Sequence, residues 1–297
     1  MKKNIYYKHY SKVILLTIIF SLLTISIARS LIDIYAVSSN KQLVCVPIFM
    51  YHQVKNINLG KDVISPDEFE SDLKYLSENH YNTITMSQLI DYVYDGKPLP
   101  ENPIILSFDD GSISIYKNVF PLLKQYNTKI VLSIVGKSTD DYSKVSDDNI
   151  NYAVITWDEV YEMDKSGLVE IQNHSYNLHR IRNGRYGCYK KDDESTSQYE
   201  EVITEDINTL QEKIKTITDK VPTTFTYPYG KYNDLTENIL KKLGFKATLS
   251  CTYGVNLIDK NPETLYGLKR ICRSHNQPVD KLIKGGMKTI KYNEDKK

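Results

Sequence analysis

The chain has 297 residues, enough for one large domain or two modest ones. Its 38 basic and 37 acidic side chains leave a formal net charge of +1, which argues against a protein that binds nucleic acid through its overall field. None of the four cysteines forms a Cys-x-x-Cys pair, and this argues against a zinc ribbon.

The first 39 residues have the pattern of a targeting segment. The basic stretch 1–12 precedes the charge-free apolar run Val13–Ala28, as in a secretion signal or membrane anchor. The run is longer than a signal core and shorter than a full span of about 20 residues. Two weak cleavage sites, 26–28 and 36–38, follow, and we favour an uncleaved anchor. We therefore predict a cytoplasmic tail, anchor helix and linker over 1–39. The domain over 40–297 would lie outside the membrane, or be secreted if the signal is cleaved.

The sequence after the linker clearly predicts strands and helices. The apolar stretch Leu43–His52 predicts a first buried strand. A helix follows, with Ser65 as N-cap, Pro66 at its first position and Glu68 completing a capping box. Residues 87–96 predict a second, shorter helix. Strands and helices alternate from this point.

The alternation predicts an α/β fold. Continuous apolar strands between amphipathic helices are typical of a parallel sheet covered by helices, and about seven such units favour a (β/α) barrel. A long polar insertion occupies 182–198. The expected strands are 103–108, 129–135, 168–174, 223–230 and 245–250, and the expected helices are 116–127, 156–167, 204–218 and 233–244.

Polar clusters follow three of the predicted strands. Asp109 and Asp110 end one strand, "NHSYNLH" (173–179) ends another, and "YPYG" (227–230) ends a third. In a parallel α/β fold these ends meet at one edge, where binding sites collect. Two adjacent carboxylates are costly to take out of water unless a cation compensates them.

The histidines of the second cluster supply a reason for the paired aspartates. His174 and His179 are five residues apart, so they cannot share a helix face and converge only if the residues between them form a loop. Two histidines and a carboxylate are typical ligands of a divalent metal with an open water position. One aspartate would then be neutralised by the metal, and the other would be free to act as a base.

Three motifs in order resemble those of a known family. "SFDDG" (107–111), "NHSYNLH" (173–179) and "FTYPYGKY" (225–232) are similar to the first three motifs of polysaccharide deacetylases of carbohydrate esterase family four. The resemblance covers roughly Val46 to Arg273. It implies a distorted (β/α) barrel with a divalent metal, zinc first and cobalt or nickel as alternatives. The implied ligands are Asp110, His174 and His179, and the implied general base is Asp109.

The resemblance also implies that the backbone amide of Tyr229 stabilises an oxyanion; a rigid turn explains "YPYG" equally well. The chain departs from the usual pattern at Thr226, where the family commonly has an arginine that orients the base. Arg270 is a further candidate for orienting the base or the substrate.

The chain also departs from the usual family pattern at the residue that would act as general acid. The late Leu-x-His motif of the family has only a poor counterpart at His275. "FMYHQV" (49–54) instead resembles an element of the exopolysaccharide branch, which deacetylates poly-N-acetylglucosamine and takes its catalytic histidine from this early strand. His52 is therefore the predicted general acid, with His275 second, and a structural core histidine is the alternative.

The leading hypothesis is a metal-dependent enzyme that removes N-acetyl groups from N-acetylglucosamine in a cell-wall or extracellular polymer, either peptidoglycan or an exopolysaccharide. The alternatives are an O-acetyl esterase on xylan or another glycan, a glycoside hydrolase, and a catalytically weak glycan-binding module. Adjacent aspartates suit a glycoside hydrolase badly, because its two carboxyl groups must flank the sugar. We expect a monomer, held at the membrane by its N-terminal segment, that binds no nucleic acid.

Overall fold

The computed structural model describes residues 21, 24–25, 43–145 and 147–294. The chain divides into two compact units, Met1–Leu43 and Val44–Lys297. The predicted anchor, Val13–Ala28, lies almost entirely outside the described residues. Within the described ranges, no helix is long and apolar enough to cross a membrane. All of the strands and helices described here by name belong to the second unit.

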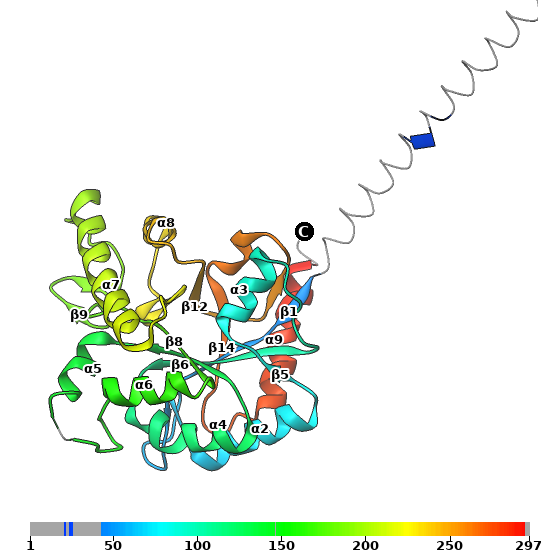
Figure 1. The fold of residues 1–297 in the computed structure, drawn as a ribbon, viewed down its shortest axis with the longest axis horizontal. Coiled ribbons are helices and arrows are strands. Elements are labelled where there is room, and N and C mark those ends of the chain that lie inside the picture. The colour runs from blue at the N-terminus through cyan, green and yellow to red at the C-terminus, as the bar shows by residue number, and fades with distance from the viewer. Residues whose placement is uncertain (1–20, 22–23, 26–42, 146, 295–297) are drawn as a thin grey trace, which may run out of the picture. The chain divides into compact units, whose positions relative to one another are not determined.

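Seven parallel strands of this unit close into a barrel, as predicted (Figure 1). Their order is β2, β14, β12, β11, β8, β7 and β6, and β6 pairs back with β2 to close the ring. A short strand, β5 (Asn82–Thr83), extends the sheet beside the start of β6. The barrel strands are β2 (Ile48–Tyr51), β6 (Pro103–Asp110), β7 (Ile130–Ile134), β8 (Val169–Asn173), β11 (Thr224–Thr226), β12 (Ala247–Tyr253) and β14 (Leu268–Cys272).

The first strand differs from its prediction. Leu43–His52 does not form one strand, because Pro47 lacks a backbone N–H and interrupts the ladder. The segment before it, β1 (Val44–Val46), pairs antiparallel with β13 (Asn256–Ile258). The segment after it is β2, which lies between β14 and β6 in the barrel. Outside the barrel lie β3 (Gln53–Val54) with β4 (Val63–Ile64), and β9 (Ile181–Arg182) with β10 (Arg185–Tyr186).

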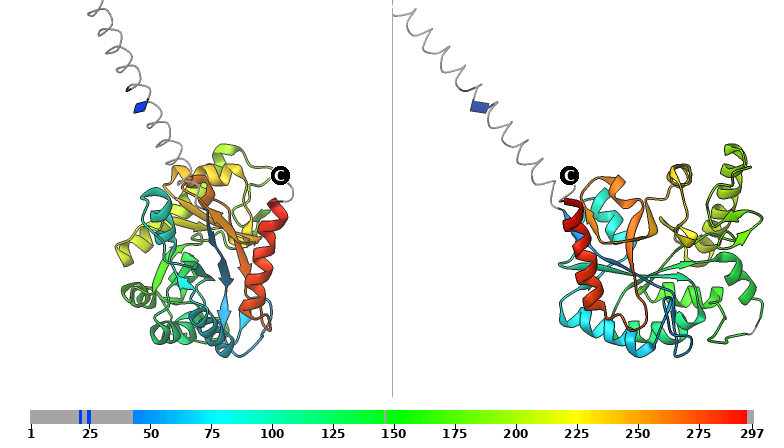
Figure 2. Two further views of the ribbon diagram at one scale, coloured as in Figure 1. Left: turned by 90° about the vertical axis from the view of Figure 1, so that its right-hand side faces the viewer. Right: turned by 180° about the vertical axis from the view of Figure 1, so that it is seen from behind.

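Helices pack around the outside of the barrel (Figures 1 and 2). The predicted capping box of the first helix forms, with Ser65 and Glu68 each binding the other's backbone. The helices are α2 (Pro66–Glu78), α3 (Met86–Tyr94), α4 (Phe120–Tyr126), α5 (Gly136–Tyr142), α6 (Trp157–Lys165), α7 (Thr196–Thr218), α8 (Asp234–Lys242) and α9 (Val279–Glu294), with 3₁₀ turns at Pro228–Gly230 and Pro262–Leu265.

Two predicted helices begin elsewhere. The helix expected from residue 204 begins at Thr196, because Ser195 and Gln198 form a capping box that was not predicted. The helix expected from residue 116 begins as a π-helical turn, Ile115–Val119, and becomes α-helical at Phe120.

Successive side chains of β6 point alternately to the hydrophobic core outside the barrel and to the candidate site inside it. Phe108 packs outward against α2, with its ring stacked on Tyr51 at 4.8 Å and edge-on to Phe69 at 5.6 Å. Successive residues of a strand face opposite sides. Ser107 and Asp109 therefore face the barrel interior, where both contact Arg270 of β14.

The junction between β8 and β11 has little backbone pairing. Phe225 and Asn173 are its one paired position in the described barrel. Side chains complete the junction, since Oε1 of Gln172 accepts hydrogen bonds from the backbone N–H groups of Thr223 at 3.1 Å and Thr224 at 2.9 Å. Side chains thus supplement the single backbone pairing at this junction.

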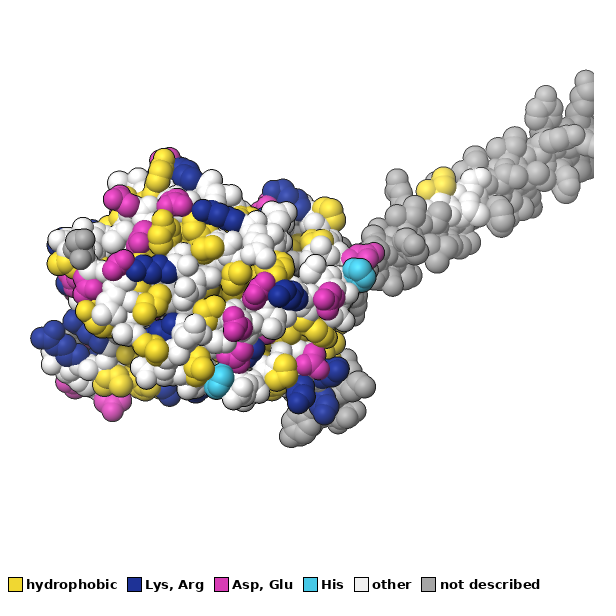
Figure 3. All heavy atoms as spheres, turned by 90° about the horizontal axis from the view of Figure 1, so that it is seen from below, with side chains coloured by type: hydrophobic (Ala, Val, Ile, Leu, Met, Phe, Trp, Pro, Cys, Tyr) yellow, Lys and Arg dark blue, Asp and Glu magenta, His cyan; other side chains and the backbone are white. Residues whose placement is uncertain are grey.

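The face shown in Figure 3 is not dominated by charges of a single sign. On the face shown in Figure 3, acidic and basic side chains are interspersed among apolar ones. This agrees with the formal net charge of +1. Recognition of a charged ligand therefore depends on local groups rather than on the whole molecule.

Candidate active site

The residues predicted from the motifs meet at the C-terminal edge of the barrel. Asp109 and Asp110 end β6, His174 directly follows β8, and Tyr229 follows β11. His52 follows β2, whose last residue pairs with Phe108. One rim of the barrel thus carries all of these side chains.

Asp110, His174 and His179 form a compact group of ligand atoms. Oδ1 of Asp110 lies 3.5 Å from Nε2 of His174 and 3.3 Å from Nε2 of His179. The three ligand atoms lie within 4.8 Å of one another. Oδ1 of Asp110 is buried and has no hydrogen-bond partner in the described residues. A buried oxygen without a partner beside two imidazoles fits a divalent cation.

The backbone fixes the orientation of His174. Its Nδ1 lies 2.8 Å from the carbonyl oxygen of Thr226, so the N–H is at Nδ1 and the Nε2 lone pair faces Asp110. Burial favours the neutral form of Asp110, but contact with His174 and the proximity of His179 hold the pKa of this carboxyl well below its usual range. Asp110 is therefore a carboxylate at neutral pH.

Helix α7 holds the loop between the two histidines. Ser175 adopts a φ of 73°, which is rare for a residue other than glycine, and its N–H donates to the side chain of Asn173 at 2.8 Å. The carboxylate of Asp206, on α7, accepts from the backbone N–H groups of Tyr176 and Asn177, each at 2.8 Å. Burial raises the pKa of Asp206 to about 6, although these two bonds oppose the rise. No sequence motif marks Asp206 as part of the site.

We predict that Asp206→Ala weakens metal binding without removing a ligand. The substitution leaves two backbone donors of the histidine loop unpaired, and loss of such supporting bonds typically costs about 10- to 100-fold in metal affinity. Titration of the metal-free protein with zinc measures the effect. Glu205→Ala, at the exposed neighbouring position, is the control. Equal zinc affinities for the two variants would show that Asp206 does not position the loop.

Asp109 is buried in a bidentate ion pair. Its two oxygens lie 2.8 Å from Nη1 and 2.8 Å from Nη2 of Arg270. Arg270 is itself held by the carbonyl oxygen of Ser250 at 2.7 Å and the hydroxyl of Ser107 at 3.2 Å. Burial favours the neutral acid, but the charges of Arg270 and His174 and the hydrogen bonds from Arg270 together keep the pKa of Asp109 below its usual range. Arg270 thus fixes the carboxylate that the motifs single out as a base.

His52 lies close to both aspartates. Its proximity contributes to lowering the pKa of Asp109 and of Asp110. Nδ1 of His52 is buried without a hydrogen-bond partner among the described residues, and the nearest carboxylate oxygen to it, of Asp62, is 3.9 Å away. The ring is therefore not held by the strong hydrogen bonds that mark a purely structural histidine.

His275 has a different environment. Its Nδ1 lies 2.9 Å from Oε2 of Glu68, at the start of α2, and its backbone N–H donates to the carbonyl oxygen of Gly60. Burial opposes ionisation of Glu68, yet hydrogen bonds from Ser65 and His275 lower its pKa to about 2. The imidazole of His275 is thus held by a hydrogen bond with Glu68.

Tyr229 adopts a left-handed backbone conformation, with φ 58° and ψ 10°. Its ring centroid lies 4.4 Å from that of His179 and 4.9 Å from that of Tyr186. Tyr186, on β10 of the polar insertion, was not predicted as part of the site; an aromatic residue inside a polar segment was its only signal. The insertion therefore forms one wall of the site.

Comparisons with known proteins agree with the motifs. The family model described as polysaccharide deacetylase matches residues 96–248. The chain is 30% identical over 220 residues to the poly-beta-1,6-N-acetyl-D-glucosamine N-deacetylase of Escherichia coli (strain K12), covering 68% of this chain and 32% of that protein. It thus spans about a third of that relative. The enzyme of the same name from Staphylococcus aureus (strain N315) is 28% identical over 225 residues, covering 71% of each chain.

A solved structure extends the similarity to the fold. The de-N-acetylase from Aggregatibacter actinomycetemcomitans superposes with a TM-score of 0.68 at 25% sequence identity, covering 80% of this chain and 100% of that one. These matches confirm the predicted relation to deacetylases of the poly-N-acetylglucosamine branch. At the level of the family, they also confirm the prediction of a hydrolase that acts on carbon–nitrogen bonds. The chain belongs to the polysaccharide deacetylase family.

Proposed function

We propose that the chain removes N-acetyl groups from N-acetylglucosamine residues of an extracellular polysaccharide and releases acetate. The observation that carries the proposal is the Asp110–His174–His179 group beside the buried ion pair of Asp109 with Arg270. The relatives named as poly-beta-1,6-N-acetyl-D-glucosamine N-deacetylases support this choice of substrate.

The ligand group fits a divalent metal, with zinc as the first choice for two histidines and a carboxylate. Asp110, His174 and His179 would hold the ion. Such an ion polarises the acetyl carbonyl and lowers the pKa of a water molecule. The supporting contacts of Thr226 and Asp206 keep the two histidines in their binding orientation.

The remaining residues move protons and stabilise charge. Asp109 accepts the proton of the attacking water while Arg270 holds its carboxylate in place. The backbone N–H of Tyr229 donates to the oxyanion that forms on the acetyl carbonyl. His52 donates a proton to the departing sugar amine, which leaves poorly until it is protonated.

The proposal is tested by measuring acetate release from a panel of glycans with the purified second unit and added zinc. Release from N-acetylglucosamine oligomers is the expected result. Release from O-acetylated xylan alone would assign the chain to O-acetyl esterases. Binding of the oligomers with no release from any glycan would indicate a glycan-binding module.

We predict that His52→Ala greatly reduces cleavage of the amide, by about 10²- to 10⁴-fold, the usual scale for positioned proton transfer. An activated acetyl ester should lose far less, because its leaving group needs little protonation. The control is His275→Ala, which removes the partner of Glu68 and should have a mild effect. Equal losses on amide and ester would argue against an acid role for His52.

We also propose that the domain acts outside the cytoplasm. The charge-free run Val13–Ala28 after a basic stretch supports this location. Protease added to intact cells should then degrade the domain. Protection until the cells are lysed would contradict both the location and a polymeric extracellular substrate.

A further inference from the structure

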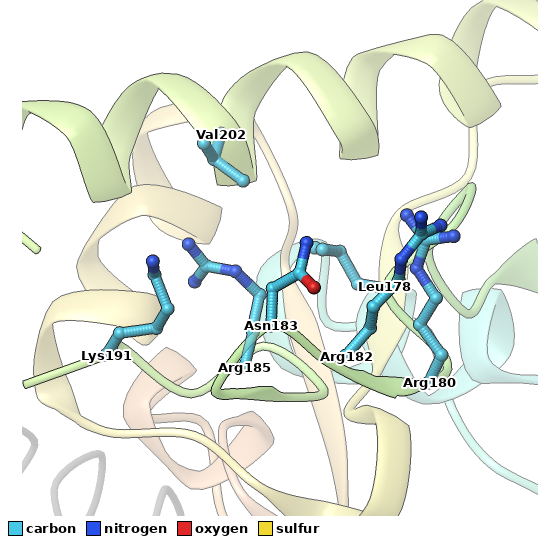
Figure 4. Close-up of a pocket in the computed structure, with 7 residues that line it drawn as sticks. All are labelled: Leu178, Arg180, Arg182, Asn183, Arg185, Lys191 and Val202. Atoms are coloured by element: carbon cyan, nitrogen blue, oxygen red, sulfur yellow. The ribbon is translucent and has the colours of Figure 1, made fainter.

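A basic pocket lies beneath α7, on the side of the domain that carries the insertion. It has a volume of about 290 Å³, with Leu178 and Val202 as its apolar lining. Figure 4 shows the polar side chains of Arg180 and of the insertion extending towards α7. The cationic lining residues are Arg180, Arg182, Arg185 and Lys191.

Two of the cations have acidic partners nearby. Arg185 forms an ion pair with the buried carboxylate of Glu194. Nζ of Lys191 lies 3.5 Å from the exposed carboxylate of Asp193. Arg185 and Lys191, which lie towards the left of the pocket in Figure 4, are thus partly neutralised by these carboxylates.

Arg180 and Arg182 have no such partners. Within the described part of the chain, neither guanidinium group donates a hydrogen bond or forms an ion pair. The charge of Arg180 acts on Asp206, but both oxygens of that carboxylate already accept backbone N–H groups. Two uncompensated guanidinium groups in one pocket repel each other and attract an anion. Their planar donors match the oxygens of a carboxylate or phosphate group.

The pocket adjoins the candidate active site. Leu178 directly precedes His179, and Tyr186 directly follows Arg185. The ring of Tyr186 packs on Tyr229, which packs on His179. The insertion approaches the loop after β11 so closely that a Cβ atom on Gly187 would lie 2.8 Å from the carbonyl oxygen of Pro228. One segment therefore lines both the pocket and the site.

We propose that this pocket binds a carboxylate or phosphate substituent of the glycan whose acetyl group occupies the neighbouring site. The proposal rests on the proposed function and narrows its substrate. A strand of N-acetylglucosamine alone carries no charge, and its deacetylated product carries ammonium groups that the pocket repels. The preferred polymer thus carries acidic groups near the sugar that is deacetylated.

The test uses Arg180→Gln/Arg182→Gln and three N-acetylglucosamine oligosaccharides of equal length. One is neutral, one bears a carboxylate and one bears a phosphate on the sugar next to the reacting residue. The unaltered protein should have a lower KM for at least one acidic substrate. The variant should raise that KM by about 10- to 100-fold, the scale of charge-assisted hydrogen bonds, with kcat and the neutral substrate little affected. Comparison of the acidic substrates identifies the anion.

The control is Lys281→Gln/Lys288→Gln, which removes two positive charges from α9, across the barrel from α7 (Figures 1 and 2). Equal KM values of the unaltered protein for all three substrates, or an equal loss in the control, would overturn the proposal. If no substrate releases acetate, the proposed function fails instead. Calorimetric titration with the acidic oligosaccharides and with inorganic phosphate then still decides whether the pocket binds anions, since the variant should abolish any heat of binding.

Discussion

Replacement of His179 by alanine is expected to remove metal and activity together. His179 supplies one of three ligand atoms, and its Nε2 lies 3.3 Å from Oδ1 of Asp110. Two remaining ligands hold a divalent ion weakly, and the loss of its Lewis acidity removes several kcal/mol of transition-state stabilisation. We expect kcat/KM for amide hydrolysis to fall by roughly a thousandfold or more. Metal content after dialysis and acetate release are the two measurements.

The matched control is His80→Asn. His80 follows α2 with a φ of 58°, a conformation that asparagine tolerates, and its side chain is exposed. This variant should keep both metal and activity. A His179→Ala protein that retains a full equivalent of metal and normal turnover would remove His179 from the ligand set.

Asp109→Asn is expected to separate metal binding from catalysis. The variant keeps Asp110, His174 and His179, so its metal content should be unchanged. Its turnover should fall by about 10²- to 10⁴-fold, because an amide cannot accept the proton of the attacking water. Loss of the metal from this variant would show that Asp109 is itself a ligand.

Stability has to be measured alongside turnover. Asp109→Asn leaves the guanidinium of Arg270 buried without a charged partner, and breaking such a pair costs about 3–5 kcal/mol of unfolding free energy. Asp72→Asn is the control, because Asp72 forms a buried bidentate pair with Arg273, at 2.7 and 3.0 Å. It should be similarly destabilised, yet its folded fraction should keep normal turnover. A comparable loss of turnover in both variants would trace the effect of Asp109→Asn to stability rather than to catalysis.

The sequence was sufficient to predict where the ligand group would form. Asp110, His174 and His179 follow strands whose apolar runs are unambiguous, and parallel strands bring their ends to one edge. The barrel was predictable for the same reason. The seventh strand, β14, was not predicted, because its residues include the charged Lys269 and Arg270, which interrupt the apolar run.

The supporting contacts were not predictable in the same way. Arg270 is 161 positions away from Asp109, and the sequence offered it only as one candidate for orienting either the base or the substrate. Thr226 contributes its carbonyl oxygen to His174, a role that any residue type can fill. Asp206 is one acidic residue among several on α7, and only the folded chain shows which of them meets the histidine loop. Partners distant in sequence depend on packing that local patterns do not encode.

The side-chain junction between β8 and β11 has a consequence for how this scaffold can diversify. A backbone ladder keeps its spacing whatever the side chains are, whereas here Gln172 and His174 span the gap to Thr223, Thr224 and Thr226. A shorter residue at position 172, such as asparagine, would leave the backbone N–H groups of Thr223 and Thr224 without this acceptor, where β11 begins. The contact between these two strands therefore depends on the residue at position 172, whereas the backbone ladders of the other barrel strands depend on no single side chain.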